Sequence, residues 1–165
     1  MKWQSHKVLT FSIVGFITGS AITAFLSALG SVIPDAIEGH GYKECNTDRY
    51  WRWKKRHRTM SHWWFIYAIT LFGGLFALRC GDTGYKVLGY VVFCFSVGGL
   101  CHIAQDALSG KVPFLRPFKK NFGIRLVKTG SVVEIIAVTL MSGILLYYAK
   151  DKLINSIFSL IIEKK

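Results

Sequence analysis

Four long apolar runs alternate with polar segments along this chain. The hydrocarbon core of a bilayer is about 30 Å thick and takes about 20 residues to cross as a helix. The second run, residues 63–78, is slightly short for a perpendicular span but can extend into Thr59 and Ser61, and the other three are long enough. We therefore predict an all-α fold: a helical integral membrane protein with about four transmembrane helices, in a single domain over residues 1–165. The helices are expected near residues 8–33, 61–78, 87–107 and 131–149, followed by an interfacial helix in the tail, residues 151–165.

The first run, residues 8–33, contains no charged residue and carries a small residue at every fourth position from Gly15 to Ser31. In a single helix these residues form one stripe that lets another helix approach closely. We expect a homo-oligomer, if one forms, to use this face at Gly15 and Gly19. Two alternatives stay open. The run can be a secretory signal peptide, or it can bend at its glycines and return, which brings its two ends together.

The amino-acid composition is typical of an integral membrane protein. Of the residues, 52% are hydrophobic and 15% aromatic, and the mean hydropathy is +0.36. The net charge is +12, but the basic residues lie almost entirely between the apolar runs, as the positive-inside rule expects for cytoplasmic loops. Basic and aromatic residues over 50–58 would also suit nucleic acid. The apolar flanks favour the bilayer surface instead, so nucleic acid is not an expected partner.

A histidine and an aspartate stand four residues apart near the end of the third run, at His102 and Asp106. Residues at i and i+4 lie on the same face of a helix, so both side chains can bind the same ligand or ion. In apolar surroundings such groups are costly unless they are paired, bound to a metal or facing water. The pair is therefore a candidate site, beside the plainer interpretation of a helix cap and a core hydrogen bond.

Two more polar clusters reach the same side of the membrane if all four runs span it. Asp35 and Glu38 follow the first run, and His57 and His62 precede the second. Histidines and carboxylates that converge from distant segments are what a divalent-metal site requires. We expect a polar metal-binding site at one membrane face. Zn is the metal we expect most, and Mn or Fe are the alternatives.

Three motifs resemble the YdjM-like family of bacterial inner-membrane-associated proteins of the LexA-regulated type, for which metal-dependent hydrolysis is the suggested activity. In chain order they read V-I-P-D-A-I-E, H-R-T-M-S-H and G-G-L-C-H-I-A-Q-D-A-L-S-G-K-V-P-F-L-R-P-F. The resemblance implies a multi-pass protein of the bacterial inner (cytoplasmic) membrane. One departure concerns Glu38, because the family pattern has its second early acid two residues after the first, and Glu38 comes three residues after Asp35.

The same resemblance implies a set of metal ligands: His6, Asp35, His57, His62, His102 and Asp106. His6 presents a geometric conflict. In one straight helix His6 would lie roughly 40 Å from Asp35, at 1.5 Å per residue. His6 can therefore be a ligand only if the first run bends.

We expect a membrane-bound, metal-dependent hydrolase of an anionic ester or phosphoester, with a lipid-linked substrate as an option because the site meets the bilayer surface. A metal-activated water would attack, and a carboxylate that is not a ligand would accept its proton. Asp35, Glu38 and His57 are the catalytic candidates. Arg58 and Arg116 are candidates for binding the anionic substrate. The alternative is a membrane protein that binds or transports a metal ion without catalysis.

Overall fold

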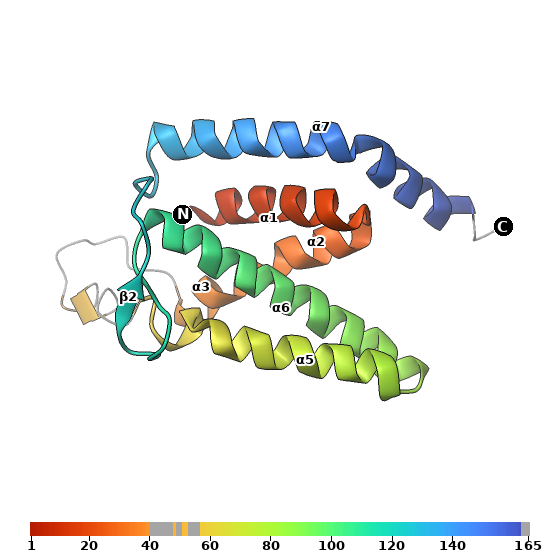
Figure 1. Cartoon of the computed structure of the whole chain (residues 1–165), viewed down its shortest axis with the longest axis horizontal. Coiled ribbons are helices and arrows are strands. Elements are labelled where there is room, and N and C mark those ends of the chain that lie inside the picture. Colours follow the sequence, from red (N-terminus) through yellow and green to blue (C-terminus); the bar gives the residue numbers. More distant parts are fainter. Residues whose placement is uncertain (40–47, 49–50, 53–56, 163–165) are drawn as a thin grey trace.

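The computed structural model describes residues 1–39, 48, 51–52 and 57–162, and most of them are helical. Figure 1 shows the long helices side by side, with the N-terminus, α3 and the short strands gathered at one end. The elements are α1 (Trp3–Thr18), α2 (Ala21–Gly30), α3 (Ile33–Glu38), the 3-10 helix η1 (Met60–His62), α5 (Trp64–Cys80), α6 (Thr83–Ser109), β1 (Val112–Pro113), β2 (Lys120–Phe122) and α7 (Val132–Ile162).

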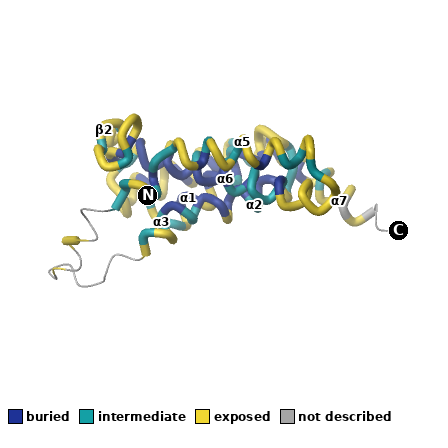
Figure 2. Tube along the Cα trace, turned by 90° about the horizontal axis from the view of Figure 1, so that it is seen from below, coloured by how far each residue is buried: buried dark blue, intermediate teal, exposed yellow. Residues whose placement is uncertain are grey.

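The prediction of a helical membrane protein is confirmed. Among the described residues, three helical stretches are long and apolar enough to cross a bilayer, and α5 is a shorter apolar helix beside them. The three stretches are Ala21–Glu38, Thr83–Ser109 and Val132–Ser159. Buried residues run through the middle of the molecule, whereas α5 and α7 expose much of their apolar surface (Figure 2). Helices that are apolar on their outward faces suit contact with lipid.

The first apolar run forms a helical hairpin. α1 ends where Gly19 takes the left-handed conformation (φ 66°), which glycine adopts without strain. α2 begins directly afterwards, because the Ser20 hydroxyl accepts a hydrogen bond from the Thr23 N–H. The predicted single helix over 8–33 is therefore wrong, and the bent alternative is correct. The hairpin returns the chain to the end where it started, so α3 lies near the N-terminus (Figure 1), and ligand atoms of His6 and Asp35 lie within 4.8 Å of each other.

The small residues of this run pack inside the chain. A Cβ atom on Gly15 would contact Leu153 of α7 and Ala24 of α2, and one on Gly19 would contact Lys152 of α7. The face on which we expected two copies to meet is therefore covered by α2 and α7 of the same chain. Homo-oligomer formation itself stays a prediction.

α7 is one continuous helix of 31 residues, so the predicted break between residue 149 and an interfacial tail is wrong. No glycine or proline follows Gly143, and the charged residues from Lys150 to Lys152 are good helix formers or tolerated in a helix. Packing extends the helix as well. Ala149 and Leu153 are buried, and Leu153 lies against Gly15 of α1.

α5 and α6 form a hairpin whose bounds differ slightly from the predicted ones. The Asp82 carboxylate accepts a hydrogen bond from the Tyr85 N–H, which starts α6 at Thr83 instead of residue 87. At the other end, η1 occupies residues 60–62, so α5 begins at Trp64. These shifts lengthen the third span and shorten the second.

Glu134 is a buried acid that ties the start of α7 to the start of α1. Its Oε1 accepts hydrogen bonds from the Lys2 N–H (2.9 Å) and the Ser5 hydroxyl (2.7 Å), and its Oε2 accepts one from the Gly130 N–H (2.7 Å). Because hydrogen bonds to charged groups contribute roughly 1.5–3 kcal/mol each, we expect Glu134→Gln to lower the free energy of unfolding by about 2 kcal/mol. Thermal unfolding in detergent measures the change. Asp151→Asn, at an exposed position of the same helix, is the matched control, and equal unfolding temperatures for the two variants would contradict this anchoring role.

Candidate metal centre

Six ionisable side chains converge at the end of the helices that carries the N-terminus and α3 (Figure 1). We call this group the polar cluster: His6 of α1, Asp35 and Glu38 of α3, His62 of η1, and His102 and Asp106 of α6. All three histidines are fully buried. The structure therefore brings together, from four separate segments, five of the six predicted ligands.

Two glycines of α6 allow this helix to pack closely enough to place His102 and Asp106 in the polar cluster. Gly98 packs against the backbone of α2, and Gly99 packs against the ring of Tyr67. Because α6 and α2 approach so closely, the Ser31 carbonyl oxygen comes within 2.6 Å of His102 Nδ1. The close contact between the two helices thus fixes the orientation of one imidazole ring.

Each of the three imidazole Nδ1 atoms faces an oxygen atom that accepts a hydrogen bond. The pairs are His6 with Gln105 Oε1 (2.8 Å), His102 with the Ser31 carbonyl (2.6 Å) and His62 with Glu38 Oε1 (3.2 Å). These acceptors place a proton on Nδ1 and leave Nε2 to act as the ligand atom. Metal-binding histidines have this arrangement, in which an outer oxygen orients the ring and raises the basicity of the nitrogen.

The Nε2 atoms and two carboxylates face a common space. His62 Nε2 lies 3.1 Å from His102 Nε2, 3.3 Å from Asp35 Oδ1 and 3.4 Å from Asp106 Oδ2. His6 Nε2 lies 3.4 Å from Asp106 Oδ1. Ligand atoms bound tetrahedrally at zinc distances are about 3.3 Å apart. The separations therefore fit a small divalent ion.

Two buried atoms that border this space, His6 Nε2 and Asp35 Oδ1, make no hydrogen bond of good geometry among the described residues and keep only ion-pair contacts, with Asp106 Oδ1 at 3.4 Å and His62 Nε2 at 3.3 Å. A buried polar atom left unpaired costs roughly 1–3 kcal/mol, so such atoms need an explanation. A divalent cation in this space would satisfy both. Imidazole nitrogens together with carboxylate oxygens are a donor set that suits Zn, Mn or Fe.

Glu38 orients the part of the cluster that η1 contributes. Its carboxylate accepts hydrogen bonds from the Ser61 hydroxyl and the Arg58 N–H, and it lies 2.6 Å from His57 Nδ1. With both oxygens engaged, Glu38 holds His62 in place instead of facing the central space. His57 lies at the rim beside Glu38, with its side chain 24% exposed. Among the described residues it does not belong to the ligand atoms that gather within 4.8 Å of one another.

Arg58 forms a two-pronged ion pair with Asp106. Its Nε lies 2.7 Å from Asp106 Oδ2, and its Nη2 donates to Asp106 Oδ1 (2.9 Å) and to the Ser109 hydroxyl (3.2 Å). The guanidinium that we expected to bind substrate is thus paired with a carboxylate of the cluster. The amino group of Met1 also lies 2.8 Å from Asp106 Oδ1. Arg116 is exposed between β1 and β2, and no hydrogen bond or ion pair in the described part of the chain joins it to the cluster.

The carboxylates control the protonation of His62, which precedes α5. Burial alone lowers the pKa of His62, but its hydrogen bonds with Asp106, Asp35 and Glu38 outweigh burial and raise the pKa to about 10. At neutral pH the metal-free histidine therefore carries both ring protons. A metal ion that binds Nε2 has to displace one of them.

We expect Zn²⁺ binding at pH 7.5 to release about one proton from His62. Below the raised pKa the proton competes with the metal, so the affinity for Zn²⁺ should rise as the pH increases toward that value. Titration calorimetry in two buffers of different ionisation enthalpy measures the released proton. Binding without proton release, and with the same affinity at pH 6.5 and pH 8.5, would contradict the assignment of His62 as a ligand.

The sequence analysis missed two polar groups that support the cluster. Gln105 is buried and lies between His6 and the Thr10 hydroxyl, to which its Nε2 donates at 2.9 Å. A glutamine in an apolar helix is costly unless it is paired, and that cost is a signal that could have identified it. The Ser31 carbonyl carries no such signal, because every residue has a backbone carbonyl.

Comparison with known proteins gives one informative result. The chain matches the model of the family described as YdjM inner membrane protein over residues 1–162. No curated protein and no solved structure matches it. The family match spans all the segments that contribute to the polar cluster, from α1 to α6.

Proposed function

The chain belongs to the YdjM inner membrane protein family, and from this premise we propose that it is a membrane-bound, metal-dependent hydrolase of anionic esters or phosphoesters. One observation carries the proposal: three buried histidines direct their Nε2 atoms into a space that they share with two carboxylates. Zn²⁺ is the first candidate for the metal, with Mn²⁺ or Fe²⁺ as alternatives.

His62, His102 and Asp106, whose ligand atoms lie within 4.8 Å of one another, would hold the ion, and His6 would border it from a second such group, which it forms with Asp35 and His102. When bound, the ion would supply a nucleophile from water near neutral pH and polarise the scissile ester or phosphoester group. Asp35 would accept the proton of the attacking water, because its buried Oδ1 borders the same space and its polar contacts there are the ion-pair contacts with His62 and His102, at 3.3 and 3.7 Å.

The other polar residues in and around the cluster would position the metal ligands, move protons or attract the substrate. Glu38 orients His62, and Arg58 keeps Asp106 in a fixed position. His57 and Glu38, joined at 2.6 Å at the exposed rim, would pass the released proton to solvent. Arg116 and the other basic residues that follow α6 would attract an anionic substrate from the bilayer surface.

We place the cluster at the cytoplasmic surface of the inner membrane. Because the first run is a hairpin, the N-terminal segment shares one side of the bilayer with both long loops. Ten of the 14 lysines and arginines among the described residues lie on that side, which the positive-inside rule assigns to the cytoplasm. The cluster lies at one end of the helices and not halfway along them (Figure 1). This location suits chemistry at the surface better than ion conduction across the bilayer.

Hydrolysis by detergent-purified protein loaded with Zn²⁺, Mn²⁺ or Fe²⁺ tests the proposal. The substrates are bis(p-nitrophenyl) phosphate, p-nitrophenyl butyrate and phosphatidylglycerol. We expect turnover of at least one of them, abolished by EDTA and restored by the metal. His62→Ala should lower turnover by more than about 100-fold, since even outer residues of metal sites change activity by 10–100-fold.

Arg79→Ala is the control for this experiment, because Arg79 is exposed at the opposite end of α5. It should keep the wild-type rate. Full activity in His62→Ala would contradict the proposed role of the cluster. A wild-type protein that binds metal and turns over none of the three substrates would contradict hydrolysis and favour a metal-binding or transport function.

A further inference from the structure

We propose that an apolar cavity between α1, α6 and α7 binds an acyl chain of an anionic phospholipid whose headgroup lies at the polar cluster. This inference rests on the proposed hydrolase function and adds a substrate class to it. Four features of the cavity support it: its lining, its connection to the cluster, its open side and the charge of the segment beside it.

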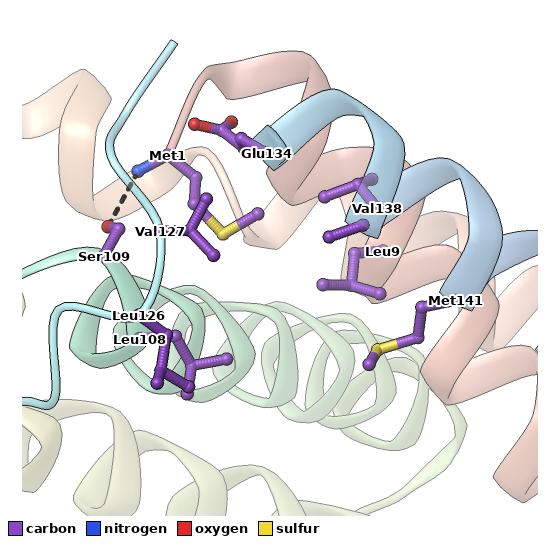
Figure 3. A pocket seen from close by; sticks show the side chains of 10 residues that line it. Met1, Leu9, Leu108, Ser109, Leu126, Val127, Glu134, Val138 and Met141 are labelled. Atoms are coloured by element: carbon purple, nitrogen blue, oxygen red, sulfur yellow. Dashed lines mark hydrogen bonds between the residues drawn. The ribbon is translucent and has the colours of Figure 1, made fainter. Parts of the chain in front are cut away.

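The cavity has a volume of about 230 Å³ and is lined almost entirely by apolar side chains (Figure 3). An apolar cavity of about 150 Å³ is enough to bind benzene, so this one has room for several methylene groups. Its walls include Leu9 of α1, Leu108 of α6, Leu126 and Val127 of the segment after β2, and Val138 and Met141 of α7.

One end of the cavity reaches the polar cluster through Ser109. The Ser109 hydroxyl accepts a hydrogen bond from Arg58 Nη2 at 3.2 Å and lies 3.4 Å from Asp106 Oδ1. The lining has two other polar groups. Glu134 is already engaged with three donors and ties α7 to α1, and the Met1 amino group donates to the Ser109 hydroxyl at 3.3 Å and lies 2.8 Å from Asp106 Oδ1 (Figure 3). A phospholipid with its acyl chain in the cavity would therefore place its headgroup at Ser109, beside the polar cluster.

Two other apolar hollows lack this connection. One lies between α3, α5 and α6 near Ile33 and Phe95, and the other lies under Phe114 and Phe122. Neither is lined by a residue of the polar cluster or by Ser109. Of these three hollows among the described residues, the cavity at α7 is therefore the one from which a bound acyl chain can place its headgroup beside the polar cluster.

The cavity opens toward the region that lipid occupies. Leu126 and Met141, on its outer side, are 66% and 52% exposed. Leu126 belongs to the segment between β2 and α7, and Met141 to the third turn of α7, at the level where that helix exposes apolar side chains. Exposed apolar side chains at this level face acyl chains, so a lipid tail could enter sideways without crossing water.

The connection between α6 and α7 selects an anionic headgroup. Residues 110–131 contain six lysines and arginines and no acidic residue. Basic residues near a bilayer surface attract anionic lipid, and the attraction grows with their number. A neutral apolar compound would gain nothing from this charge, so an anionic phospholipid fits the surroundings best.

Photolabelling in vesicles of phosphatidylethanolamine and phosphatidylglycerol tests the proposal. The probe is phosphatidylglycerol with a diazirine in one acyl chain, and mass spectrometry locates the labelled residues. We expect saturable labelling at Leu126 and Met141 that excess unlabelled phosphatidylglycerol reduces at least five-fold. Val138→Trp, which fills the cavity, should remove this labelling, and so should Ala137→Trp at an exposed position of the lining that does not disturb the core.

Ile136→Trp is the matched control, because Ile136 is exposed on the same helix and does not line the cavity. It should keep the saturable labelling. Labelling that is not saturable, or that is equal in Ala137→Trp and Ile136→Trp, would overturn the inference. The experiment is run with and without EDTA, and metal content is measured in each variant. Saturable labelling without bound metal would support the lipid site and contradict only the hydrolase function.

Discussion

Gly98→Leu is expected to prevent the protein from reaching its folded state. A side chain at this position would overlap backbone atoms of α2: its Cβ would collide with the Ser27 carbonyl oxygen and lie 2.6 Å from Ser31 N. Rigid backbone cannot yield as a flexible side chain can, so the cost should exceed the 1–3 kcal/mol that is typical of overpacking. Moving α2 away would also withdraw the Ser31 carbonyl from His102. The measurements are the yield of monodisperse protein in detergent and its unfolding temperature.

Gly73→Leu is the control for this substitution, because no atom lies within 4 Å of a Cβ built on Gly73. That variant should unfold within a few degrees of the wild type. Gly98→Leu with a wild-type unfolding temperature would show that α2 and α6 do not make this close contact. The orientation that we assign to His102 would then lose its basis.

Removal of the metal is expected to lower the unfolding temperature by about 10 °C. An ion that binds only the folded protein stabilises it by about 4 kcal/mol when its concentration is a thousand times its dissociation constant, and 1 kcal/mol corresponds to about 2–4 °C for a chain of this size. The cause is local, since without the ion His6 Nε2 and Asp35 Oδ1 keep only the looser ion-pair contacts with Asp106 and His62, at 3.4 and 3.3 Å. Scanning fluorimetry of zinc-loaded protein with and without EDTA measures the shift.

His102→Ala should abolish the response to EDTA, because His102 belongs to both groups of ligand atoms that the structure brings together. Arg79→Ala should keep the full shift. An equal shift in His102→Ala and the wild type would mean that the stabilising ion binds elsewhere in the chain.

The apolar runs and the His102 and Asp106 pair could be predicted from the sequence for simple reasons. Span length follows from bilayer thickness, and i, i+4 spacing fixes two side chains on one helix face. The helical membrane fold followed directly from these patterns. The bend at Gly19 was harder to predict from the sequence, because a glycine in an apolar run is compatible both with a straight helix and with a left-handed cap. That single choice decides whether His6 lies beside Asp35 or at the opposite end of the helix.

The roles of Glu38 and Arg58 could not be predicted from spacing. Glu38 stands one residue later than the family pattern expects, and only the fold shows that it accepts bonds from η1 and the loop before it. Arg58 has the sequence character of a substrate-binding arginine at the bilayer surface. The structure pairs it with Asp106 because α6 and the loop before η1 end at the same place. Such contacts between distant segments leave no periodic trace in the sequence.

Metal content tests the central claim most directly. Plasma mass spectrometry is applied to detergent-purified wild type, His62→Ala, His102→Ala and His57→Ala, each reconstituted with Zn, Mn and Fe and freed of excess metal. We expect near-stoichiometric metal in the wild type, its loss in His62→Ala and His102→Ala, and its retention in His57→Ala, since His57 lies at the rim beside Glu38. A wild type that stays metal-free after reconstitution, or equal metal in all four proteins, would contradict a shared metal centre and leave the cluster as a hydrogen-bonded network.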